Sequence, residues 1–290
     1  MSQLALARIA GLELLTRGRI SRVPEPDLVM DDPSRVAAYA AAGEEDGPLA
    51  GIFFFNAAHA CELIRPGDSV LDLACGPAGQ LALLARLNPK AHFTGIDLSD
   101  PMLARARRRI AAAGLRNVEV RRGDMTDLRE FPDGSFDVVL CTFSLHHLSH
   151  VQDLERTFWE VHRVGKPSGG VFLVDFGRLR RKRSIDYFAD QYAKWSPTLF
   201  TEDKRNSMRA AFSSEDFRHA SELLGDRALF YASFLLPVVV AVKSPPRRAL
   251  EREQRAALAR FRRALPRWQE TEISALIRLF RLGGLKTPAV

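Results

Sequence analysis

The sequence predicts an α/β protein with a doubly wound, mostly parallel seven-stranded sheet and an antiparallel edge strand. Between residues 69 and 176, five short β-rich runs alternate with helical segments of about a dozen residues, a pattern typical of βαβ units. The first run ends on glycines, as is usual where a parallel strand turns into a helix beside a ligand. Two further extended runs within 227–244 meet at Pro237, so we expect them to form an antiparallel pair at the sheet edge.

The elements of this central region follow in order along the chain. The helix expected at 101–114 carries Pro101 in its first turn and Gly114 at its end, the preferred positions of these residues. Ser214 and Asp216 are suited to cap the last helix. The expected strands cover residues 69–75, 92–98, 117–124, 136–143, 169–176, 227–236 and 238–244, and the expected helices cover 80–88, 101–114, 153–165, 184–195 and 213–225.

Helical extensions are expected on both sides of the sheet. Before it, three prolines between residues 22 and 34 separate a first short helix from two later ones. After it, apolar residues follow the i, i+3, i+4, i+7 spacing of an amphipathic helix, namely Ile273, Leu276, Ile277 and Phe280. We therefore divide the chain into a helical N-terminal cap (1–58), a central domain (59–244) with an aromatic helical insert (178–212), and a basic helical C-terminal extension (245–290).

The positive charge of the chain lies in the C-terminal extension. The net charge is +7, and residues 245–290 alone hold eleven Arg or Lys against four Glu. The remaining chain is therefore neutral, which argues against a nucleic-acid-binding protein. We expect the tail helices to dock on the body or on a second subunit as a homo-oligomer contact, with contact to a membrane surface or an anionic substrate as the alternative.

Several features indicate a cytoplasmic protein without a membrane span. The longest apolar run, 234–242, is too short to cross a bilayer. Arg8 and Glu13 interrupt the apolar start, which is unlike a secretory signal. The three cysteines are widely spaced, which argues against a disulfide framework and fits a reducing compartment.

The turn after the first strand indicates which ligand the sheet binds. A dinucleotide site would show G-x-G-x-x-G, but this turn offers Ala74, Gly76, Ala78 and Gly79. Asp72 lies near the end of the strand, where a carboxylate repels a pyrophosphate and attracts an ammonium group. The turn therefore predicts a ligand with a positively charged end.

At these residues the chain resembles class I S-adenosylmethionine-dependent methyltransferases, in their small-molecule branch. "VLDLACGPAG" resembles the family motif D/E-x-G-x-G-x-G, with alanine at two glycine positions, and "EVHRVGKPSGG" resembles E-x-x-R-V-L-K-P-G-G. The resemblance covers roughly residues 50–243 and implies a Rossmann-like methyltransferase fold with S-adenosyl-L-methionine as cofactor. By the same resemblance Asp97 accepts from the ribose hydroxyls, Leu98 lines the adenine pocket, and Asp124 accepts from the adenine amino group. The cofactor-binding residues that it implies are Asp72, Ala74, Gly76, Asp97, Leu98, Asp124, Met125 and Cys141. The structural alternatives are that Asp97 caps a helix and that Asp124 caps a turn.

The stretch "CTFSLHHLSH", residues 141–150, raises the question of a metal site. His146 and His150 have the i, i+4 spacing of helical zinc ligands, but the loop supplies no third and fourth ligand, so we predict no metal. We predict His146 as the catalytic group that orients or deprotonates the acceptor. The alternatives without a functional role are that His147 forms a hydrogen bond to the loop backbone and that His150 is exposed to solvent.

The acceptor pocket is expected among the additions to the sheet. The candidate residues are Tyr39, Asn56, His147, Tyr187 and Tyr192. The aromatic stripe of the insert is equally compatible with a plain hydrophobic core. The resulting hypothesis is methyl transfer to O, N or C of a small or medium-sized molecule by in-line displacement. The alternatives are an RNA or peptide methyltransferase, and a non-catalytic S-adenosylmethionine-binding partner or regulator.

Overall fold

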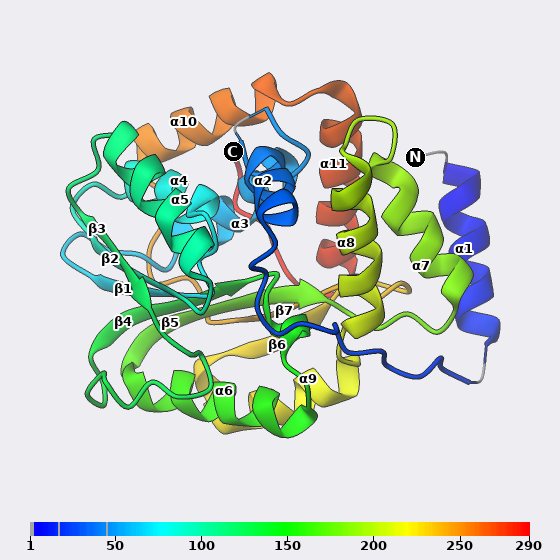
Figure 1. Ribbon diagram of the computed structural model, residues 1–290, viewed down its shortest axis with the longest axis horizontal. Coiled ribbons are helices and arrows are strands. Elements are labelled where there is room, and N and C mark those ends of the chain that lie inside the picture. Colours follow the sequence, from blue (N-terminus) through cyan, green and yellow to red (C-terminus); the bar gives the residue numbers. More distant parts are fainter. Residues whose placement is uncertain (1–2, 17, 45) are drawn as a thin grey trace.

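The computed structural model describes residues 3–16, 18–44 and 46–290 and contains a seven-stranded mixed sheet (Figure 1). The strand order is β3-β2-β1-β4-β5-β7-β6. The first five strands along the chain pair in parallel, and β7 runs antiparallel to both of its neighbours. The strands are β1 (Ser69–Leu73), β2 (His92–Asp97), β3 (Val118–Arg122), β4 (Phe136–Thr142), β5 (Gly165–Phe176), β6 (Leu229–Ala232) and β7 (Val239–Lys243). The predicted fold class is confirmed, with β6 and β7 as the antiparallel pair at the edge.

Helices cover both faces of the sheet, because successive strand residues point to opposite sides. In β1, Val70 belongs to the core on one face and Leu71 to the core on the other. Figure 1 shows one layer above the sheet and one below. The upper layer contains α3 (Ala50–Cys61), α4 (Gly79–Leu87), α5 (Asp100–Ala112) and α10 (Arg252–Ala264), and the lower layer contains α6 (Val151–Val164) and α9 (Ser214–Ser221).

Helix caps fix where several of these helices begin. The Ser99 hydroxyl accepts a hydrogen bond from the Met102 N–H at the start of α5. At α9 the capping residue is Ser213, and not Ser214 as the sequence predicted. The Ser213 hydroxyl accepts from the Asp216 N–H, and the Asp216 carboxylate accepts from the Ser213 N–H. Ser214 is therefore the first residue inside the helix.

A third group of helices stands beyond the carboxyl ends of the parallel strands (Figure 1). The group comprises α1 (Gln3–Leu15), α2 (Pro33–Ala42), α7 (Lys182–Ala189), α8 (Thr198–Ala210) and α11 (Arg267–Leu282). Short 3₁₀ turns occur at η1 (Leu145–His147), η2 (Asp190–Tyr192) and η3 (Glu222–Arg227). Within the described ranges, no helix is both long and apolar enough to cross a bilayer.

The C-terminal helices pack on the body through α3. The Phe280 ring of α11 stacks on Phe55 of α3, with ring centroids 5.3 Å apart, and both side chains are fully buried. In addition, Gln269 in α11 accepts from the Gly51 N–H at 2.6 Å and donates to the Gly47 carbonyl at 2.9 Å. Helix α3 itself runs without a break across residues 58 and 59, where the sequence suggested a domain boundary.

Candidate active site

Two adjoining cavities lie at the point where the strand order reverses between β1 and β4, the usual ligand site of such sheets. We call them the strand-end cavity, of about 280 Å³, and the capped cavity, of about 190 Å³. The strand-end cavity is bordered by the loops after β1, β2 and β3, and the capped cavity extends beneath α3, α8 and α11. Residues that line both are Met30, Tyr39, Ala74, Gly76, Phe143 and His147.

The loop after β1 is shaped by left-handed backbone and tied to β2. Ala74, Gly76 and Ala78 have φ angles of 53°, 53° and 59°. Alanine takes this conformation at a cost of about 1–2 kcal/mol, so the surrounding contacts must hold it there. One such contact is the Gly76 N–H, which donates to the Asp97 carboxylate at 2.8 Å. The two departures from the glycine-rich motif therefore keep the backbone path of a ligand-binding turn.

The predicted cofactor residues of β2 and β3 line the strand-end cavity together. Asp97, Leu98, Asp124 and Met125 all border it. Asp97 accepts from the Ser99 N–H at 2.9 Å. The N-cap residue of α5 is Ser99, so the alternative that Asp97 caps this helix is not met. Burial raises the pKa of Asp97. The Asp124 carboxylate accepts from the N–H and hydroxyl of Thr126, both at 2.8 Å, so the turn-capping alternative for Asp124 is also met.

The buried wall of the capped cavity next to the β1 loop is polar. Asp72 is only 3% exposed, and burial, followed by the negative charge of Asp97, raises the pKa of Asp72 to about 8. Asn56 is 1% exposed, and neither its amide nitrogen nor its amide oxygen has a hydrogen-bond partner. The Gln80 side-chain oxygen is also buried without a partner. A cationic or hydrogen-bonding ligand group would satisfy this wall, which fits the ammonium-bearing end predicted from the sequence.

His146 is held in one orientation by Asp175. Its Nδ1 lies 2.7 Å from Oδ1 of Asp175, and its backbone N–H donates to Oδ2 at 2.9 Å. Asp175 is fully buried in β5, and His146 is 3% exposed. The turn that carries His146 starts at Phe143, whose φ of 54° directs the chain away from β4. His146 therefore lies on a 3₁₀ turn and lines the capped cavity, as predicted for an acceptor-facing residue.

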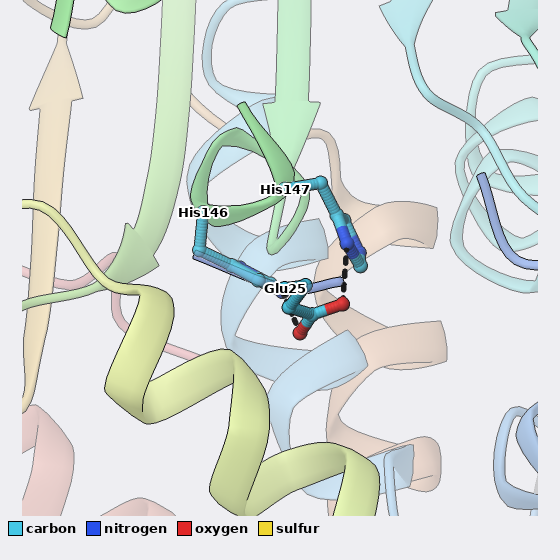
Figure 2. A group of neighbouring side chains, drawn as sticks. All are labelled: Glu25, His146 and His147. Carbon is cyan, nitrogen blue, oxygen red and sulfur yellow. Dashed lines mark ion pairs between the residues drawn. The ribbon is translucent and has the colours of Figure 1, made fainter. Parts of the chain in front are cut away.

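The structure brings in Glu25, which the sequence did not single out. Its carboxylate lies between the two histidine rings, with Oε2 2.9 Å from Nδ1 of His147 and Oε1 3.9 Å from Nε2 of His146 (Figure 2). Ser207 in α8 donates to Oε1 at 2.8 Å. Burial alone would raise the pKa of Glu25, but its contacts with His147 and His146 lower it to about 2. Burial alone would lower the pKa of His147, but Glu25 raises it.

Glu25 belongs to an extended segment, residues 19–32, which we call the strap. Arg22 fastens it by donating to the carbonyls of His146 at 3.0 Å and Ser149 at 2.5 Å, and to that of Ala210 at 2.6 Å. Near its other end, the Ser99 hydroxyl donates to the Met30 carbonyl and to the Asp31 carboxylate, both at 2.8 Å. The strap thus links α8, the His146 turn and the start of α5. The prolines on both sides of Glu25 were the only local sign in the sequence that this segment is extended.

The remaining predicted residues differ in where they lie. Tyr39, Asn56 and His147 line the capped cavity, but Tyr187 lies outside its described lining and the adjacent Phe188 takes that place. The side chain of Tyr192 falls outside the described part of the chain. Cys141 is fully buried in the core, and the lining begins one residue later. A role for its carbonyl stays a prediction.

Glu25, His146 and His147 also form a set of metal-ligand types. Within the described residues, their ligand atoms lie within 4.8 Å of one another. Two histidines and a glutamate suit zinc or iron. The hydrogen bonds to His147 and Ser207 already give Glu25 partners without an ion. That the site binds no metal stays a prediction.

Comparison with known proteins gives one family and one fold. Residues 70–169 match the family model described as a methyltransferase domain. The chain is 37% identical over 113 residues to a demethylmenaquinone methyltransferase of Listeria monocytogenes, which covers 39% of this chain and 46% of that protein. It is 34% identical over 201 residues to an uncharacterized 37.1 kDa protein in a transposon of Streptomyces fradiae, which covers 68% of this chain and 52% of that protein. The chain thus spans about half the length of these relatives.

The fold agrees with solved methyltransferase structures. A SAM-dependent methyltransferase from Aquifex aeolicus superposes with a TM-score of 0.51 at 20% identity, covering 74% of this chain and 98% of that one. The sheet with its antiparallel pair is the Rossmann-like methyltransferase fold that the motifs implied.

Proposed function

Because the chain carries a class I, S-adenosylmethionine-dependent methyltransferase domain, we propose that the protein transfers a methyl group from S-adenosylmethionine to a small, largely apolar molecule in the capped cavity. The observation that carries this proposal is the junction of the two cavities. The strand-end cavity borders Asp97 and Asp124, the capped cavity borders both Asp72 and His146, and six residues line both cavities. A donor and an acceptor bound in these cavities would therefore meet at the His146–His147 turn.

The residues present fit the cofactor. Asp97 and Asp124 would hold its adenosine part, and the buried, unpartnered amide of Asn56 together with Asp72 and Gln80 would hold its charged amino-acid end. When bound, the cofactor supplies an electrophilic methyl group on a sulfonium. The chain's own contribution is to hold the acceptor in line with that methyl, to exclude water, and to take up a proton at Nε2 of His146.

The walls of the capped cavity support a small apolar acceptor. Aromatic and aliphatic side chains dominate its lining, among them Phe53, Phe143, Phe176, Phe188, Phe200, Ile273 and Leu276. Helices of the N-terminal and C-terminal extensions roof it, which argues against a polymer such as RNA as acceptor. The relatives named for demethylmenaquinone act on a small molecule and support the same class.

Calorimetric titration with S-adenosylhomocysteine tests the proposal. We expect one binding site per chain, and tritium from methyl-labelled S-adenosylmethionine should enter solvent-extractable products when apolar acceptors are supplied. Absence of binding would contradict the proposal. Binding with no transfer to any acceptor would instead favour the non-catalytic alternative.

The Asp72 carboxyl should make the stability of the ligand-free protein depend on pH. The pKa of Asp72 is raised to about 8, whereas an unfolded aspartate ionises near about 3.9. Between these values the folded protein keeps a proton that the unfolded chain releases, so stability should fall as pH rises from about 4 to about 8. Asp72→Asn removes this contribution, and its melting temperature should exceed that of the wild type increasingly toward about pH 8.

Melting curves by circular dichroism at several pH values check this expectation. Asp27→Asn, on the exposed part of the strap, is the matched control and should follow the wild type. If Asp72→Asn also followed the wild type at every pH, the folded carboxyl would not be protonated as described.

A further inference from the structure

Two hydrogen-bond acceptors face each other where the capped cavity meets the His146 turn. A carboxylate has no proton to donate, so the proton shared between Asp175 and His146 lies on Nδ1 of the imidazole. In the neutral ring, Nε2 then presents a lone pair. It faces Oε1 of the Glu25 carboxylate across 3.9 Å, too far for a direct hydrogen bond (Figure 2). A donor placed to one side of the line between the two atoms could therefore reach both of them.

The charges around this pair favour a cationic or proton-rich group. The buried carboxylate of Asp175 lies behind His146, Asp97 acts on the neighbouring His147, and Asp203 acts on both His147 and Glu25. The other carboxylate oxygen of Glu25, Oε2, is paired with Nδ1 of His147 at 2.9 Å. The guanidinium of Arg22 is bound to backbone carbonyls of the turn. The lone pair of Nε2 therefore faces Oε1 of Glu25, which already accepts from the Ser207 hydroxyl at 2.8 Å and can accept a second hydrogen bond.

The rest of the cavity offers few other partners at this point. The rings of Phe143 and Phe176 pack against each other with centroids 4.9 Å apart, and His146 lies 5.6 Å from Phe176. A polar ligand group brought here can bond to Nε2 and to the remaining lone pair of Oε1, and a buried polar group left without a partner weakens binding. The two acceptors consequently select the group that enters.

A nitrogen with two protons satisfies both acceptors at once. An amino nitrogen at about 2.9 Å from each atom can span the 3.9 Å between them. A hydroxyl has a single proton and can donate to only one of the two atoms, so Oε1 would keep only the hydrogen bond that it accepts from Ser207. An amino group is also attracted to the Glu25 carboxylate when it is protonated.

We propose that the methyl acceptor is an amine, namely a primary or secondary amino group on a largely apolar molecule, bound between Nε2 of His146 and Oε1 of Glu25. This inference rests on the proposed function and names its substrate class. The ammonium form gives one proton to Nε2 of His146. The nitrogen lone pair then forms the new N–C bond as the C–S bond breaks, and that electron pair stays on sulfur, leaving S-adenosylhomocysteine. The product is the methylated ammonium, and the proton on His146 returns to water when the product leaves.

A pair of matched probes tests the proposal without knowledge of the natural acceptor. 1-Naphthylmethylamine and 1-naphthalenemethanol have nearly the same shape and differ in the amino or hydroxyl group. With the protein saturated by S-adenosylhomocysteine, NMR titration should show the amine binding about tenfold or more tightly, the effect of one charge-assisted hydrogen bond of roughly 1.5–3 kcal/mol. Glu25→Gln should reduce this preference to less than about threefold, because the carbonyl of glutamine carries no charge. Asp27→Asn, from the exposed part of the same strap, should keep it.

The outcomes separate this inference from the proposed function. If S-adenosylhomocysteine binds but the wild type prefers the alcohol, binds the two probes equally, or binds neither, the amine inference is wrong and the methyltransferase proposal stands. A preference that persists in Glu25→Gln would also contradict it. One zinc or iron per purified chain that is lost in Glu25→Gln would show that the two atoms face a metal. Failure to bind S-adenosylhomocysteine would defeat both proposals.

Discussion

Asp97→Ala should weaken binding of S-adenosylhomocysteine by about 10²- to 10³-fold. The variant removes a carboxylate that would accept from two ribose hydroxyls, and hydrogen bonds to charged groups contribute roughly 1.5–3 kcal/mol each. It also releases the Gly76 N–H, which Asp97 holds at 2.8 Å, and with it the left-handed turn after β1. Isothermal titration calorimetry measures the effect directly.

The matched control for this prediction is Asp100→Ala, three residues along the same loop and helix start. The Asp100 side chain is 69% exposed, so its removal should change the affinity by less than about threefold. The unliganded Asp97→Ala protein must retain a cooperative melting transition for the comparison to hold. An Asp97→Ala protein that is folded and binds as tightly as the Asp100→Ala protein would remove Asp97 from the cofactor site.

Phe280→Ala should destabilise the whole protein by about 3–5 kcal/mol, the usual cost of truncating a fully buried phenylalanine. The Phe280 ring is 0% exposed and stacks on Phe55, which is equally buried in α3. Since α3 also packs on α4 and the sheet, the loss should lower the midpoint of a single urea transition followed by circular dichroism.

Leu282→Ala is the control, because Leu282 lies in the same helix and is 66% exposed. It should leave the urea midpoint almost unchanged. Two separate transitions in Phe280→Ala, with the later one at the wild-type position, would mean that the C-terminal helices form an independent unit.

The parts of the fold and site that the sequence predicted are those with local signals. The strands alternate with helices of similar length, so the sheet could be assigned from periodicity and turn residues. Asp97 and Asp124 could be placed at one edge of the sheet because Asp97 ends β2 and Asp124 closely follows β3, and strand ends in a parallel sheet share one edge. Their role in cofactor binding stays a prediction. His146 could be placed at the cavity because the turn follows β4 directly.

The missed features depend on contacts between distant parts of the chain. Glu25 acquires its role from His147 and Ser207, to which no spacing in the sequence connects it. Phe188 and not Tyr187 lines the cavity because of how α7 is rotated against α8. Aromatic residues at two neighbouring positions of a helix do not show from the sequence which of them faces the cavity. Docking of the C-terminal helices on the body was predicted only beside other options, because an amphipathic pattern does not show which surface covers the apolar face. Cytoplasmic location and oligomeric state stay predictions.

The pairing of α3 with α11 has a consequence for synthesis of the protein in the cell. Phe55 emerges from the ribosome long before Phe280, the residue on which its ring stacks. The ring of His59 in α3 likewise emerges long before Thr287, whose hydroxyl lies 3.2 Å from its Nε2. Until those late residues appear, the nascent chain must carry an uncovered aromatic surface, which is the kind of surface that chaperones bind and that aggregates. The fold of α3 is thus completed only after the C-terminal helices have emerged, and a chain stopped short of residue 280 should be a target for degradation.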